Sequence, residues 1–169
     1  CDASAVEGLR LIYPNLPIVY NDPSNLEARG KMLVGSCLSG ISFLKGLGFV
    51  HAISHMVGAE FDTQHGLTNA IVLPSVLKYN RHVMDKKIPI MSEAMGLKKN
   101  DFDNFYQSFC NLLDQLEIPK NLKEIGVEAS SVERLAEKAL KDSAFATNPR
   151  TASLKEMVDL INISMNKGR

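Results

Sequence analysis

The spacing of hydrophobic residues predicts helices in almost every segment of the chain. Val6, Leu9 and Ile12 recur at three-residue intervals and begin a helical stripe that we expect Pro14 and Pro17 to break. No strand signal is convincing, so we predict an all-α fold, a helical bundle forming one domain over residues 1–169. Further helices are predicted over residues 26–43, 49–61, 67–79, 101–116 and 131–140, and from residue 153 onward.

Turn and glycine signals refine this outline. Ser24 follows a turn and is expected to cap the helix after it, and Asp101 and Ser153 are expected to cap the helices that follow them. Lys86 to Pro89 is expected to form a surface loop, and Pro74 should kink its helix. The helix over 26–43 also contains three glycines at five-residue intervals, Gly30, Gly35 and Gly40. Glycine costs about 1 kcal/mol in a helix interior. The three glycines therefore indicate either close packing against another backbone or a weak helix.

Charge and cysteine content exclude several classes of function. The chain carries 19 basic and 19 acidic residues, so it lacks the net positive charge that favours binding to nucleic acid or to an anionic membrane. Its apolar runs are too short to span a bilayer. Cys1, Cys37 and Cys110 include no CxxC pair, so we expect a reducing cytoplasm, with Cys37 and Cys110 buried. Because residue 2 already opens a helical pattern, we interpret the chain as part of a larger protein.

Candidate chemistry is concentrated in one segment, which holds three of the four histidines. His51 and His55 lie four apart, so a helix presents both imidazoles on one face and can offer two nitrogens to one metal. His65 follows where the chain can turn back. Packed histidines without a metal remain the alternative. Glu60 and Asp62 are expected to be solvated loop charges.

The segment from Gly46 to Asn80 closely resembles the iron-containing alcohol dehydrogenases. The resemblance is carried by the fourteen-residue spacing of His51 and His65, with His55 between them. It continues in the motif His65-Gly66-x-x-Asn69-Ala70-x-x-Leu73-Pro74 and, more weakly, in the late Asn148-Pro149-Arg150 turn. It implies the helical C-terminal domain of that family, with a dehydroquinate synthase-like architecture.

The same resemblance assigns roles to the histidines. It implies that His51 and His65 bind the metal, whereas His55 lies beside the substrate and nicotinamide as a catalytic residue. Spacing alone would instead pair His51 with His55, and we follow the resemblance. The implied metal is Fe(II), although imidazole also suits Zn(II) or another divalent ion, and the implied coenzyme is NAD or NADP. No cofactor-binding residue is identified.

Two features of the family are missing from these 169 residues: an Asp-x-x-x-His pair that supplies the other metal ligands, and a glycine-rich dinucleotide loop. We therefore expect a C-terminal fragment whose partner is a missing N-terminal dinucleotide-binding domain. Alone, the fragment should be inactive and bind iron weakly. The resemblance also suggests a homodimer or larger assembly, and we expect neither nucleic acid nor membrane as a partner.

The implied function is oxidation of an alcohol, or reduction of an aldehyde, by hydride transfer, with a cation lowering the pKa of the hydroxyl. Two alternatives stay open: a non-catalytic helical module that acts through packing or partner binding, and a related metal-dependent polyol or hydroxy-acid dehydrogenase. Among other polar residues, Lys45 either contacts a coenzyme phosphate or is solvated. Asn69 either holds His65 or a carbonyl group, or caps a helix. Arg150 is expected to fix its turn and the boundary between domains, with substrate binding as the alternative, and His82 is expected to be a surface residue.

Overall fold

The computed structural model describes residues 1–166, and these residues form α-helices and short 3-10 turns without a strand. The predicted all-α fold is therefore confirmed. The chain divides into two compact units, one of residues 1–45 and 84–116, the other of residues 46–83 and the described part of 117–169. Among the described residues no single helix is long and apolar enough to cross a membrane. Two consecutive segments, Leu26–Lys45 and Phe49–Phe61, reach the required length and apolar composition only when they are taken together.

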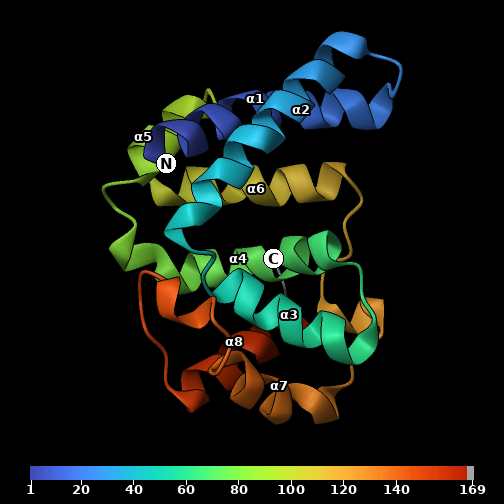
Figure 1. The fold of residues 1–169 in the computed structure, drawn as a ribbon, viewed down its shortest axis with the longest axis vertical. Coiled ribbons are helices and arrows are strands. Elements are labelled where there is room, and N and C mark those ends of the chain that lie inside the picture. Colours follow the sequence, from blue (N-terminus) through green and yellow to red (C-terminus); the bar gives the residue numbers. More distant parts are fainter. Residues whose placement is uncertain (167–169) are drawn as a thin grey trace. The chain divides into compact units, whose positions relative to one another are not determined.

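The first unit is built on the pairing of its two long helices (Figure 1). It comprises α1 (Asp2–Asn21), α2 (Leu26–Ser42), η1 (Phe43–Lys45), α5 (Ile88–Ala94) and α6 (Phe102–Gln115). Close approach of α1 and α2 requires glycine, because a Cβ atom at Gly35 would lie 2.7 Å from Cγ1 of Ile12. By contrast, Gly30 and Gly40 have open space where a Cβ atom would lie. The close-packing interpretation therefore holds for Gly35 alone.

Several local predictions for this unit were wrong. α1 runs through Pro14 and Pro17 to Asn21, because packing against α2 holds the helix. The cap of α2 is Asn25, whose side chain accepts from the Ala28 N–H. Pro89 lies in the first turn of α5, so the expected loop ends at Lys87.

The cysteine prediction was half right. Cys110 is buried, but Cys37 is exposed. Cys37 lies on the face of α2 that is turned away from α1. The residue type alone does not indicate which face of α2 packs against α1.

The second unit carries the hydrophobic core and the histidines. It comprises α3 (Phe49–Phe61), α4 (His65–Asn80), η2 (Arg81–Val83), η3 (Leu122–Ile125), η4 (Ala129–Ser131), α7 (Val132–Ala139), η5 (Phe145–Thr147) and α8 (Leu154–Asn166). Phe49, Ile53 and Val57 on α3 are completely buried together with Leu135 and Met157. Ser153 caps α8 as predicted, since its hydroxyl accepts from the Glu156 N–H.

One ion-pair cluster ties α3 to α7. Glu60 Oε1 accepts from Nε of Arg134 at 3.1 Å, and Glu60 Oε2 lies 3.1 Å from Nζ of Lys138. The expectation of a solvated loop charge at Glu60 was therefore wrong. The hydrogen-bonded guanidinium of Arg134, more than the Lys138 ammonium, lowers the pKa of Glu60 from 4.5 to about 2.

Two glycine substitutions test the pairing of α1 with α2. Gly35→Ala should lower the free energy of unfolding by about 1–3 kcal/mol, because its methyl group would press on Ile12. Gly30→Ala meets no neighbour and should raise it by up to about 1 kcal/mol. Urea unfolding followed by circular dichroism measures both, and equal effects of the two changes would contradict the packing described.

Acid unfolding tests the Glu60 cluster. Because the folded-state pKa is depressed, the stability that Glu60 contributes is present above pH 4.5 and is lost as the pH falls toward about 2. Glu60→Gln should therefore flatten the dependence of stability on pH within that window. The matched control is Glu133→Gln, which removes an exposed carboxylate from α7. A Glu60→Gln curve as steep as that of the parent chain would refute the assignment.

Candidate functional site

A helix–turn–helix segment brings the three predicted histidines together. His51 and His55 lie one turn apart on α3, Asp62 caps the end of α3 in the left-handed conformation, and His65 is the first residue of α4. The ring centroids are 5.8 Å apart for His51 and His55, 5.2 Å for His51 and His65, and 5.4 Å for His55 and His65. The three imidazoles therefore form one cluster.

Asn69, one turn into α4, connects two of these rings. Its Nδ2 lies 3.0 Å from Nε2 of His65 and 3.4 Å from Nε2 of His51. The Ser54 hydroxyl donates to Asn69 Oδ1 at 2.5 Å, which sets the orientation of the amide. Both Nε2 atoms thus face the same amide nitrogen, and each presents its lone pair to the N–H donor. Of the two roles expected for Asn69, holding His65 is confirmed.

His55 has a different partner, which the sequence did not single out. Its Nδ1 lies 3.0 Å from Oδ2 of Asp142, a carboxylate whose side chain is only 12% exposed. The other oxygen of Asp142 accepts from the Ala144 N–H at 2.8 Å. Because Asp142 is 87 residues away in the chain, no local spacing pointed to this pair. This pair involves only Nδ1 of His55 and does not use Nε2, the other nitrogen of the ring.

The surroundings of His51 favour its neutral form. Burial lowers the pKa of His51, and the neighbouring imidazoles of His65 and His55 lower it further, against the opposing charge of Asp142. A neutral imidazole is the form that binds a metal.

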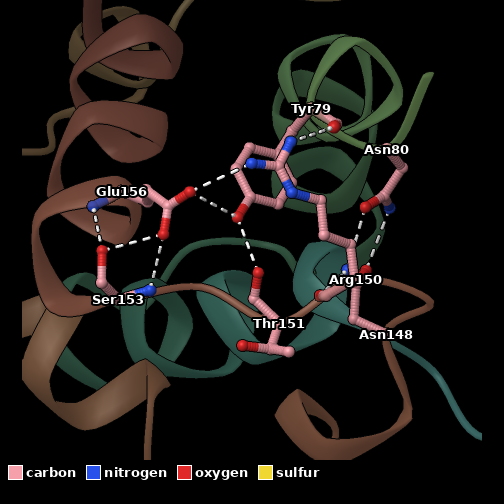
Figure 2. Close-up of polar contacts among 7 residues, drawn as sticks. All are labelled: Tyr79, Asn80, Asn148, Arg150, Thr151, Ser153 and Glu156. Atoms are coloured by element: carbon pink, nitrogen blue, oxygen red, sulfur yellow. Dashed lines mark hydrogen bonds and ion pairs between the residues drawn. The ribbon is translucent and has the colours of Figure 1, made fainter. Parts of the chain in front are cut away.

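A network of polar contacts connects the Asn148–Arg150 turn to the end of α4 (Figure 2) and also reaches the start of α3. Asn148 and Asn80 exchange two amide hydrogen bonds of 3.0 and 2.9 Å, and the Phe49 N–H donates to Asn148 Oδ1 at 3.3 Å. Arg150 lies 4.0 Å over the Tyr79 ring and donates to the Tyr79 carbonyl at 3.1 Å. Arg150 therefore fixes the turn, as expected from the sequence.

The other candidates lie outside the cluster. Lys45 pairs with Asp2 in the first unit, and His82 is exposed on η2. Within residues 1–166, no group of three or more histidine, cysteine or acidic side chains is arranged to hold a metal ion. The donor chemistry and convergence of His51 and His65 suit two positions of a metal's coordination sphere, and a metal there would need further ligands.

Comparison with known proteins gives the family. Residues 1–165 match the Fe-containing alcohol dehydrogenase family, C-terminal. The chain is 34% identical over 160 residues to the probable alcohol dehydrogenase EutG of Escherichia coli, covering 94% of this chain and 40% of EutG. It is also 34% identical to the 1,3-propanediol dehydrogenase of Citrobacter freundii, covering 94% of this chain and 43% of that protein.

A solved structure gives the same answer. The crystal structure of a 1,3-propanediol oxidoreductase superposes with a TM-score of 0.93 at 32% identity, covering 97% of this chain and 45% of that one. The chain thus spans less than half the length of these relatives. On the family match, the shared helical fold and the histidine motif, this chain belongs to the Fe-containing alcohol dehydrogenase family, of which it represents the C-terminal domain.

Proposed function

We propose that this chain is the metal-binding part of a longer, NAD(P)-linked alcohol dehydrogenase that interconverts an alcohol and an aldehyde. The observation that carries the proposal is the convergence of the Nε2 atoms of His51 and His65 on a single amide nitrogen. Two neutral imidazoles suit Fe(II), and also Zn(II) or another divalent ion. When bound, a cation would lower the pKa of the substrate hydroxyl, and a dinucleotide would supply the hydride acceptor or donor.

The chain's own residues orient the donors and handle a proton. Asn69 Nδ2 marks the point on which the Nε2 lone pairs of His51 and His65 converge, and Ser54 sets the direction of the Asn69 amide. Each Nε2 has one lone pair, so a cation bound by both rings would take the place of the Asn69 N–H donor. A carboxylate only accepts hydrogen bonds, so Asp142 holds the proton of His55 on Nδ1. Nε2 of His55 then carries the lone pair that can take the hydroxyl proton and return it. In this scheme His55 is the catalytic residue and Asp142 its positioning residue.

The remaining parts of the site belong to the longer protein. We place the other metal ligands and the dinucleotide site in an N-terminal domain, since the relatives extend well beyond the matched region. A cytoplasmic homodimer or larger assembly, acting on a small alcohol or aldehyde, completes the proposal. The 169-residue chain by itself should have no dehydrogenase activity.

Removing either ligand tests the metal assignment. In the longer protein, His51→Ala and His65→Ala should each abolish metal retention and activity together. Even the outer partners of metal ligands contribute about 10- to 100-fold to metal affinity, so the loss should exceed about 100-fold. The measurements are metal content after dialysis and NAD(P)H-linked alcohol oxidation, with His82→Ala as the control. Full metal content in either variant would contradict the assignment.

Asp142→Asn tests the role of His55. The new amide can donate to Nδ1 of His55 and so move the ring proton to Nε2, where it blocks proton acceptance. We expect kcat to fall by about 100-fold, at the lower end of general acid–base contributions, while metal content stays unchanged. Asp159→Asn, an exposed change on α8, is the control. Loss of metal together with activity would instead give Asp142 a structural role.

A further inference from the structure

The outward face of α2 and η1 is an apolar stripe without a charged residue. Its leucine residues are largely exposed to solvent, with exposed fractions of 81% for Leu26, 73% for Leu33 and 85% for Leu44. A contiguous exposed apolar surface usually marks an interaction site. The α2 stripe comprises Leu26, Gly30, Leu33, Val34, Cys37, Gly40, Ile41 and Leu44, all of them exposed.

The α2 stripe lies on the opposite side of the helix from the α1 contact. The inward side buries Ala28 and Gly35, which fall about half a turn from Leu26 and Leu33. α2 therefore has two apolar faces, and α1 covers only one of them. A helix that is apolar on both sides is typical of positions buried between two partners.

The spacing within the stripe suits a second helix. Residues 26, 30, 33, 37, 40 and 44 alternate steps of four and three, the seam along which two helices pack. Gly30 and Gly40 have open space where a Cβ atom would lie, so a neighbouring backbone can come close. The charged pair of Glu27 and Lys31, 2.6 Å apart, flanks the seam. A partner that fits the stripe would therefore present an apolar helix face with polar residues at its edges.

We propose that the α2 stripe is the packing surface for a helix from the part of the longer protein that lies outside residues 1–169. This inference rests on the longer chain of the proposed function, and the relatives extend for more than half their length beyond the match. Asp2 bonds Lys45 and, at 2.8 Å, Lys87. Residue 1 therefore lies near the Leu44 end of the stripe, where a preceding segment would reach it. A segment of the same chain also has a higher effective concentration than a second copy.

Alkylation of Cys37 reports directly on cover over the stripe. With Cys1→Ser in place and Cys110 buried, Cys37 is the thiol that a maleimide should modify. In the longer protein its modification should be at least about 10-fold slower than in the 169-residue chain, since a covered thiol reacts only through local opening. Equal rates in an active longer protein would overturn this inference and leave the proposed function standing. Absence of a longer gene product would overturn both.

A charge placed in the stripe provides a second readout. Leu33→Glu should lower the melting temperature of the longer protein but leave that of the 169-residue chain unchanged. Ser36→Glu adds the same charge to an exposed position of α2 outside the stripe, and should change neither. Cys37 protection that appears in the 169-residue chain and rises with its concentration would assign the stripe to a second copy and overturn the proposal.

Discussion

The histidine cluster depends on one side chain, that of Asn148. The first N–H groups of a helix have no partner within the helix, and the Asn148 amide satisfies that of Phe49 at the start of α3. The same amide pairs reciprocally with Asn80, the last residue of α4. One side chain therefore fixes the beginning of the helix that carries His51 and the end of the helix that carries His65.

The loop that supplies Asn148 also supplies the partner of His55. Asp142 begins this loop, which reaches back to α3 through the Ala144 carbonyl, an acceptor for the Gly48 N–H at 3.1 Å. The Thr147 hydroxyl accepts from the Leu47 N–H at 3.1 Å. Because these bonds are short-range and directional, a displacement of the loop would move His55 and the start of α3 together. The loop after α7 therefore orients the candidate site although it carries none of the three imidazoles.

The sequence predicted those features that depend on local order. The helices over 49–61 and near 67–79, the shared face of His51 and His55, and the caps at Asp101 and Ser153 follow from spacing and capping chemistry. Features that depend on contacts distant in sequence were missed. Pairing with α2 carries α1 through its prolines, and α7 converts Glu60 from a loop charge into an ion-paired one. Asp142 reaches His55 only because the core brings α3 and the loop together.

The coordination number of a divalent ion explains why a metal site here would need other residues. His51 and His65 supply two imidazoles, whereas a catalytic zinc site usually takes three protein ligands and a structural one takes four. Asp142 is engaged with His55 and the Ala144 N–H, and Glu60 is engaged with Arg134 and Lys138. Moving Asp142, which is only 12% exposed, would remove the partner of His55 Nδ1 and of the Ala144 N–H. Moving Glu60 would break its ion pairs with Arg134 and Lys138. A ligand from outside residues 1–166 therefore fits this arrangement better than Asp142 or Glu60, and an anionic one would tune how strongly the ion acidifies a hydroxyl.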